Sequence, residues 1–379
     1  MPLVLTEDQE MLRDSAHGFI QDRSPISKLR TLRDGDVPER FDRALWSEMA
    51  EMGFAGVLVP EAQGGAAFGF VGAGVIAEEM GRTLAASPFL STAVLGATAL
   101  GQLGTEEQKD RYLPGLTNGG TLFALAVDEG RKHAPSTVAM TAEREGNGFR
   151  LTGEKTFVAD GLAADRIVVA ARTGGAEDEP EGITLFVVDA KAAGVTAERM
   201  VTVDERGHAR IRFDGVVVDG DAVLGQVDQG YDGLERVLNG GRAILAAEMT
   251  GAADAAFAMT MDYLKDRKQF GVPIGSFQAL QHRAAHLMTE LEMAKATALQ
   301  ACQAMDDDMD EAGPTVSLAK AKVGQVAKLA TQEAIQMHGG IGMTDEYDVG
   351  FYLKRVRVAQ ETFGDPDFHT NRLAKVLGY

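Results

Sequence analysis

The apolar positions of the chain change their spacing twice. Over residues 6–113 they recur three and four positions apart, which predicts amphipathic helices. Over residues 121–224 they form short runs rich in branched and aromatic side chains, which predicts strands. From about residue 230 the helical spacing returns, over much longer segments. The chain therefore divides into a helical part, a strand-rich part and a second helical part.

The first helical part carries recognisable helix boundaries. Thr6 followed by Gln9 has the spacing of a capping box, in which each side chain bonds the backbone of the other residue. The segments "ALWSEMAEMGFAG" and "FVGAGVIAEEMGRTLA" predict two further amphipathic helices, each closed by glycine or loop residues. The glycine-rich stretch "VPEAQGGAAFGF" predicts the connection between them.

The strand-rich part reads as four short runs, "TLFALAV", "RIVVAAR", "ITLFVVD" and "ARIRF", separated by turns such as "EGNG". No long helical pattern interrupts them, so we expect an antiparallel sheet or a small barrel. The last part predicts long helices with short connections, which is typical of an antiparallel bundle. We therefore expect an α+β protein with a helical domain (1–120), a middle β domain (121–226) and a helical bundle (227–379).

The break in "VAQETFGDPDFHTNRLA" raises a separate question. Gly364-Asp365-Pro366 ends one predicted helix and starts another, and Glu361 and His369 lie on either side. Two acids and a histidine beside a break fit an active-site corner, but they also fit an ordinary connection between helices.

Composition narrows the class of protein. The 379 residues carry a net charge of −19, which argues against nucleic acid or an anionic membrane as the main partner. No apolar span is long enough for membrane insertion. The single cysteine, Cys302, excludes an intramolecular disulfide and fits a cytoplasmic protein. Seven histidines without ligand spacing argue against a metal site.

Two motifs point to a ligand. In "YLKDRKQFGVPIGSFQ", Arg267 stands one turn from a helix end, where it is either a solvated charge or a fork for a phosphate. In "QMHGGIG", Gly339 and Gly340 either stop a helix or leave a bare backbone that a phosphate or a ring can approach.

Together and in this order, the two motifs resemble those of the acyl-CoA dehydrogenase family, and the resemblance covers the whole chain. It implies a helical N-terminal domain, a middle β domain and a C-terminal four-helix bundle. It also implies FAD-dependent α,β-desaturation of an acyl-CoA thioester, in fatty acid or steroid catabolism. In the family these motifs bind the adenosine pyrophosphate half of an FAD held by the neighbouring subunit. The matching positions are Arg267, Gln269, Phe270, Gln336, Gly339 and Gly340.

The resemblance has a bearing on the substrate as well. Arg242 matches an arginine that the family places near the bound acyl-CoA, although a surface arginine at a helix start would explain it equally. The small residues of "AILAAEMTGAADAA" permit a bulky acyl group such as a ring system, but a closely packed bundle also requires them. The resemblance implies electron-transfer flavoprotein as the electron acceptor.

The flavin-ring end departs from the family pattern. The usual catalytic glutamate falls on Phe363, and the alternative position that some members use falls on Gly241. A threonine that usually touches the flavin is replaced by Asp365. The Thr-Glu-Pro element is "VDE" (127–129), and the Trp-x-Thr element is "FVA", in which Phe157 can still pack on a flavin. The adenosine end thus matches while the ring end differs.

Three explanations follow. The chain is one subunit of a mixed dehydrogenase that lends its adenosine-binding groups to a sister chain, or a self-sufficient dehydrogenase with a relocated base, or a structural subunit without flavin. Retention of Arg267 and Gln336 argues against the third. We expect a homo- or hetero-tetramer and favour the mixed form.

If the chain supplies its own base, we expect Glu248. It lies two turns after Gly241 on the same helical face, among small and apolar residues that raise the pKa of a carboxylate. Two turns also displace it by about 10 Å along the axis. The alternative is a buried structural glutamate, paired with a neighbouring helix or with an arginine such as Arg283.

Overall fold

The computed structural model describes residues 3–379 and divides into two compact units. The bundle unit comprises the described residues up to Thr31 together with Phe70–Ala85 and Arg242–Tyr379. The sheet unit comprises Leu32–Gly69 and Ala86–Gly241. Each unit is thus assembled from segments that are separated in the sequence.

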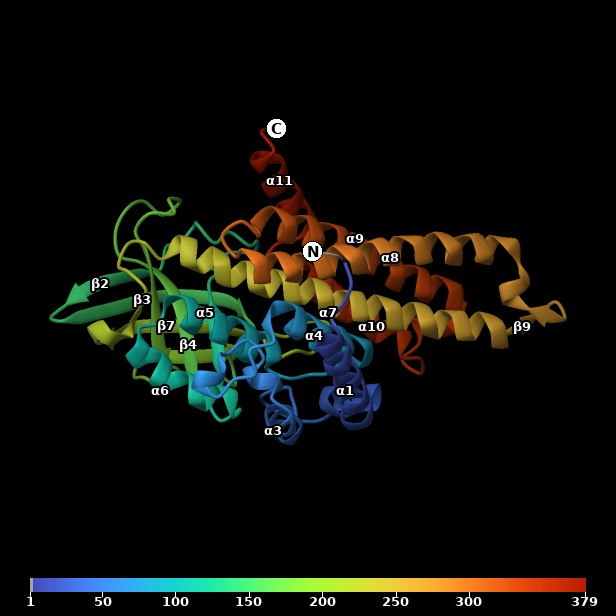
Figure 1. Cartoon of the computed structure of the whole chain (residues 1–379), viewed down its shortest axis with the longest axis horizontal. Coiled ribbons are helices and arrows are strands. Elements are labelled where there is room, and N and C mark those ends of the chain that lie inside the picture. The colour runs from blue at the N-terminus through green and yellow to red at the C-terminus, as the bar shows by residue number, and fades with distance from the viewer. Residues whose placement is uncertain (1–2) are drawn as a thin grey trace. The chain divides into compact units, whose positions relative to one another are not determined.

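Long helices form the bundle unit (Figure 1), and α9 packs against α8, α10 and α11. Helices α2 and α7 begin in one unit and end in the other. The helices with residues in this unit are α1 (Glu7–Arg23), α2 (Ile26–Asp34), α4 (Gly69–Thr83), α7 (Tyr231–Asp266), α8 (Gln278–Asp307), α9 (Gly313–His338), α10 (Val349–Glu361) and α11 (Pro366–Val376). A short hairpin, β9 (Lys268–Gln269) and β10 (Val272–Pro273), connects α7 to α8.

Local signals account for several helix boundaries. The capping box predicted at Thr6 and Gln9 is confirmed, since each side chain bonds the backbone of the other at 3.3 and 3.0 Å. Helix α9 begins with proline in its first turn, where the missing N–H has no consequence. The predicted break at 364–366 is also confirmed. Asp365 caps α11 by accepting the N–H of Phe368 at 2.7 Å.

Helices α4 and α7 approach each other closely at two glycines. A Cβ at Gly81 would lie 2.0 Å from the carbonyl oxygen of Glu248, and one at Gly251 would lie 1.9 Å from that of Glu78. Neither backbone has room for a larger residue, so these glycines set the distance between the two helices.

The sheet unit contains an eight-stranded mixed sheet in the order β6-β7-β3-β2-β4-β5-β8, with β1 paired to β4. Most pairs are antiparallel, as the sequence predicts, but β1–β4 and β2–β4 are parallel. The strands are β1 (Phe123–Ala126), β2 (Thr141–Glu145), β3 (Gly148–Val158), β4 (Arg166–Arg172), β5 (Ile183–Asp189), β6 (Val195–Arg199), β7 (Ala209–Val218) and β8 (Val223–Leu224). The helices that lie wholly within the sheet unit include α3 (Arg43–Glu51), α5 (Ala97–Leu103), α6 (Glu106–Thr117) and a π-helix, η3 (Phe89–Gly96).

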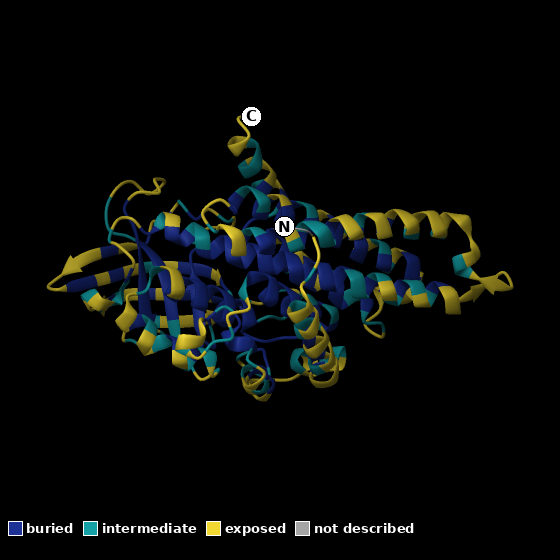
Figure 2. Ribbon diagram, viewed as in Figure 1, coloured by how far each residue is buried: buried dark blue, intermediate teal, exposed yellow. Residues whose placement is uncertain are grey.

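Burial follows the pairing in this sheet (Figure 2). Strands β1, β4 and β5 are almost continuously buried, which is typical of strands covered on both faces. Strand β7 alternates buried and exposed positions along most of its length, and β6 at the edge is mostly exposed.

Candidate functional site

The hairpin after α7 displays an aromatic side chain to solvent. Phe270 and Gly271 form its two-residue loop, and both have positive φ (54° and 82°), as in a type I′ turn. A phenylalanine in this conformation is strained by about 1–3 kcal/mol, and the residue is 93% exposed. Strain and exposure together indicate that the residue serves a surface contact.

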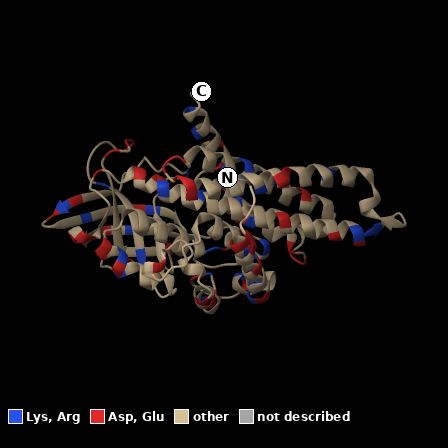
Figure 3. Cartoon of the chain, viewed as in Figure 1, with Lys and Arg blue, Asp and Glu red and all other residues tan. Residues whose placement is uncertain are grey.

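Arg267 is fixed through its backbone at the base of this hairpin. Its N–H donates to the carbonyl of Tyr263 at 2.9 Å, and its carbonyl accepts the N–H of Ile274 at 2.8 Å. Within residues 3–379 its exposed guanidinium has no hydrogen bond or ion pair. With Lys265 and Lys268 it places three cations at this end of α7 (Figure 3).

The second motif forms the turn after α9. Gly339 has φ 63° and ψ −139°, which side chains rarely adopt, and it caps the helix. A Cβ at Gly339 or Gly340 would meet nothing within 4 Å, so the backbone faces open space. The Gln336 side chain is exposed on the last turn of the helix.

Aromatic contacts bring the two motifs together. The Tyr263 ring stacks on His338 with ring centroids 4.4 Å apart, and Tyr347 contacts both rings at 5.9 and 4.9 Å. Sequence reasoning did not single out these three residues. A ring one turn before Arg267 and a histidine directly before Gly339 were the available signals.

The hairpin and the turn suit a ligand that combines phosphate with a flat ring system. The Arg267 guanidinium can bond two phosphate oxygens. The glycines leave room for close approach to the backbone, and Phe270 offers a ring face. The Gln269 side chain already makes one hydrogen bond within the chain, since its amide nitrogen donates to the carbonyl of Lys268 at 2.8 Å.

Phe157 lies in the sheet unit, at an irregularity between β3 and β7. The register of these strands shifts between Lys155 and Val158, and Phe157 takes φ 52°. The residue is 46% exposed, and its N–H donates to the sulfur of Met200 at 3.3 Å. An aromatic ring held open by a β-bulge is suited to packing on a flat ligand.

Ion pairs organise the "VDE" segment next to this strand. The fully buried Lys155 ammonium donates to Glu129 at 2.6 Å and to the carbonyl of Val127 at 3.0 Å. Burial lowers the pKa of Lys155, and the Glu129 carboxylate opposes that effect. Asp128 pairs with His133 at 2.9 Å. The charges in this segment therefore stabilise its own loop.

The corner at Phe363 keeps a defined backbone without a carboxylate. Phe363 is buried with φ 57°. Its carbonyl accepts a hydrogen bond from Arg242 Nε at 3.0 Å and one from His369 Nε2 at 3.1 Å. Arg242 is fully buried inside α7, so the alternative of a surface arginine at a helix start is wrong. Its contact with acyl-CoA stays a prediction.

Lys320 secures the same corner from α9. Its ammonium donates to the carbonyls of Ala359, Gln360 and Gly364 at 2.9–3.1 Å. Burial and the neighbouring Arg242 lower its pKa to about 7. Burial, together with the neighbouring Arg242 and Lys320, also lowers the pKa of His369, which is therefore neutral. Glu361, in contrast, is exposed and pairs with Arg357.

Glu248 lies at the close crossing of α4 and α7. The residue is 5% exposed, and its carboxylate accepts a hydrogen bond from Arg355 Nη1 at 3.0 Å. Arg283, the alternative partner considered from the sequence, instead pairs with Glu333 at 2.6 Å. The Arg355 pair supports a structural role for Glu248, while its assignment as a base stays a prediction.

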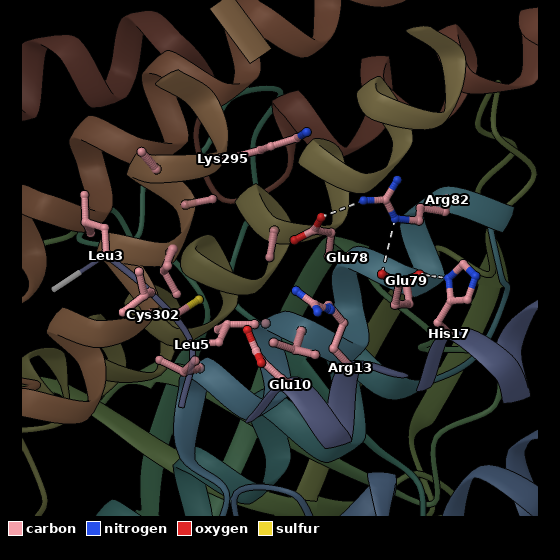
Figure 4. A pocket seen from close by; sticks show the side chains of 18 of the residues that line it. Leu3, Leu5, Glu10, Arg13, His17, Glu78, Glu79, Arg82, Lys295 and Cys302 are labelled. Atoms are coloured by element: carbon pink, nitrogen blue, oxygen red, sulfur yellow. Dashed lines mark hydrogen bonds and ion pairs between the residues drawn. The ribbon is translucent and has the colours of Figure 1, made fainter. Parts of the chain in front are cut away.

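A cavity of about 780 Å³ lies elsewhere in the bundle unit, among α1, α4, α7 and α8 (Figure 4). On its charged wall, Arg82 donates to Glu78 at 2.9 Å and to Glu79 at 3.2 Å, and Glu79 also pairs with His17 at 2.8 Å. Burial raises the pKa of Glu78. All the predicted site residues belong to the described part of the chain, and none of them lines this cavity.

Two features are absent from the described part of the chain. Within residues 3–379, no helix combines the length and the apolar character needed to cross a bilayer. The same residues contain no group of three or more His, Cys, Asp or Glu side chains arranged for a metal ion.

Family models match nearly the whole chain. They are the acyl-CoA dehydrogenase N-terminal domain (residues 6–120), middle domain (124–216) and C-terminal domain (228–378). The order of helices, β domain and helices predicted from the sequence is thereby confirmed.

Individual proteins agree with the family models. The chain is 32% identical to a 3-(aryl)acrylate reductase of Clostridium sporogenes over 94% of each chain. It matches the solved structure of a Tcur3481-Tcur3483 steroid ACAD variant at 31% identity, with a TM-score of 0.88 over 98% of each chain. It also matches the ChsE4-ChsE5 complex from Mycobacterium tuberculosis at 26% identity, with a TM-score of 0.89 over 100% of this chain and 99% of that one.

Proposed function

The chain belongs to the acyl-CoA dehydrogenase family of oxidoreductases acting on CH–CH bonds, and from this premise we propose that it binds the adenosine pyrophosphate half of FAD. The binding face, called the cradle below, consists of Arg267, Gln269, Phe270, Gln336, Gly339 and Gly340. The observation that carries the proposal is the exposed Arg267 guanidinium beside a glycine turn that is open to a ligand.

The cradle serves a flavin held by a neighbouring subunit. All six residues are exposed at one end of the bundle unit, and the exposed Phe270 ring suits a contact between chains. FAD supplies the acceptor for the β-hydrogen of an acyl-CoA thioester as hydride, while the protein supplies position and a base for the α-proton. Phe157 would pack on a flavin ring only in the alternative form, in which this chain holds a flavin of its own.

The departures at the ring end favour a mixed assembly. Phe363 carries no acid, and Glu248, the base predicted within this chain, is held by Arg355. A sister chain that holds the flavin ring and the base would complete the reaction. Two of the solved structures named above carry paired names, which supports an arrangement of this kind.

Acyl-CoA is the proposed substrate, and electron-transfer flavoprotein is the proposed electron acceptor. Arg242 is the proposed substrate-binding residue, and its Nε also donates to the Phe363 carbonyl at 3.0 Å. A ring-bearing acyl group agrees with the word "steroid" in the name of one related structure and with the aryl substrate class in the name of a relative.

Substitution of Arg267 by alanine tests the cradle. Loss of a charge-assisted phosphate contact costs about 1.5–3 kcal/mol, so we expect FAD affinity to fall about 10- to 150-fold. Flavin absorbance and fluorescence titration of the purified assembly measure the change. Arg283→Ala, which removes an exposed arginine paired with Glu333, is the matched control. If Arg267→Ala binds FAD as tightly as the parent, the assignment of the cradle is wrong. The alternative of a structural subunit without flavin is then favoured.

A further inference from the structure

We propose that Tyr263, His338 and Tyr347, called the aromatic cluster below, are positioning residues that hold the two halves of the cradle in register. The proposal rests on the proposed function, because it concerns how the cradle is built. It assigns a role to three residues outside the cradle, of which His338 is buried and Tyr263 and Tyr347 are half-buried.

The cluster joins the two halves through residues that adjoin each of them in the chain. Tyr263 accepts the N–H of Arg267 through its carbonyl, so the ring and the guanidinium belong to the same helical turn. His338 directly precedes Gly339. The stack of these two rings, with centroids 4.4 Å apart and planes 27° apart, therefore sets the distance between Arg267 and the glycine turn.

The glycine turn has little else to hold it on its ligand side. No atom lies within 4 Å of a Cβ placed at Gly339 or Gly340. On the opposite side the turn folds back on the last turn of α9, since a Cβ at Gly342 would lie 2.7 Å from the Ile335 carbonyl oxygen and 2.9 Å from the His338 Cβ. A shift of His338 would therefore also shift the turn.

His338 acts through its ring face. Its Nδ1 donates to the carbonyl of Ala334 at 2.7 Å, and within residues 3–379 its buried Nε2 has no hydrogen-bond partner. A protonated ring would leave a buried N–H without an acceptor, and burial lowers the pKa of His338 accordingly. Apart from the hydrogen bond to Ala334, packing is therefore the interaction left to this buried, neutral ring.

Tyr347 fixes the stack from a third direction. It lies after the short helix η6 (Gly339–Met343) and meets Tyr263 edge-on at 74°. The three rings come from the end of α7, the end of α9 and the segment before α10. A change in any one of these segments is therefore transmitted to both halves of the cradle.

Paired substitutions test the inference. Tyr263→Leu and His338→Leu remove a ring, whereas Tyr263→Phe and His338→Phe keep one. We expect the leucine variants to weaken FAD binding about three- to tenfold, the range expected for loss of an aromatic pair, and the phenylalanine variants to bind as the parent does. FAD titration of the flavin-depleted assembly measures this directly. Phe149→Leu, which breaks the Phe149–Phe186 contact in the sheet unit, is the matched control.

The outcomes separate the inference from the function on which it rests. If Arg267→Ala loses FAD but both leucine variants keep parental affinity, the positioning role is wrong and the cradle stands. Equal losses in the leucine and phenylalanine variants also contradict the role of stacking. If Arg267→Ala binds as the parent does, the proposed function fails first. Tyr263→Leu carries the test if His338→Leu does not fold.

Discussion

At the scale of single residues, buried charges in this protein are held by partners distant in sequence. Glu248 and Arg355 are 107 positions apart, and both are almost fully buried. Removing one member of such a pair leaves the other charge without compensation, which costs more than the pair itself contributes. Stability and catalysis can therefore be measured separately at Glu248.

Glu248→Gln keeps the shape of the side chain and removes its charge. We expect the free energy of unfolding, measured in urea, to fall by about 1–3 kcal/mol because Arg355 loses its carboxylate. We expect the rate of flavin reduction by acyl-CoA to stay unchanged. A base contributes about 10²–10⁴-fold, so a rate loss of that size would assign Glu248 as the base. Glu333→Gln, in the more exposed pair with Arg283, is the control.

At the scale of helices and strands, the glycine crossing of α4 and α7 makes a second prediction. Gly81→Ala would place a methyl group against the backbone of Glu248, which cannot move without shifting a helix. We expect a loss of about 1–3 kcal/mol in the free energy of unfolding. At Gly101, on the exposed face of α5, a Cβ meets nothing within 4 Å. There the same substitution is expected to stabilise by up to about 1 kcal/mol. Equal effects at both positions would contradict this account.

The corner between α10 and α11 predicts a dependence on pH. His369 stays neutral in the folded protein because burial lowers its pKa, while in the unfolded chain it takes up a proton below about pH 6.5. The neutral His369 therefore contributes to the free energy of unfolding above about pH 6.5, and this contribution is lost as the pH falls below that value.

When the pH falls from 7.5 to 5.5, His369 lowers the free energy of unfolding by about 1.4 kcal/mol. We expect His369→Gln to unfold with a correspondingly smaller difference between these two pH values in urea titrations. His282→Gln, at an exposed histidine of α8, is the matched control. A parental difference in the His369 variant would mean that another group is responsible.

The sequence was informative where signals are local. Thr6 with Gln9, the break at Gly364 and the lengths of α8 and α9 follow from neighbouring residues. The parallel pairing of β1 with β4 did not follow, because strand order is decided by contacts across the chain. The burial of Arg242 and Lys320 was likewise not predictable, since their acceptors are carbonyls on α10 and at the Phe363 corner.

At the scale of the whole molecule, the site predicts which chains assemble. We expect co-expression with a sister dehydrogenase to give an α₂β₂ complex that carries flavin. The reason is that this chain presents a cradle and lacks an acid at Phe363. Native mass and the ratio of FAD to chain, measured on the purified complex, check this. A fully active, flavin-saturated homo-oligomer of this chain alone would contradict the mixed assembly.

The discontinuous bundle unit has a consequence for how the protein is made. Its first segment leaves the ribosome early, but Arg242–Tyr379, which completes the unit, is translated last. The sheet unit, which ends at Gly241, has all its residues before then. Folding during synthesis therefore favours the sheet unit first, although it is not first in the chain. Until Arg242–Tyr379 has been made, the buried residues Ala16 and Ile20 of α1 lack the rest of their unit, so we expect the nascent chain to be exposed to aggregation during this interval.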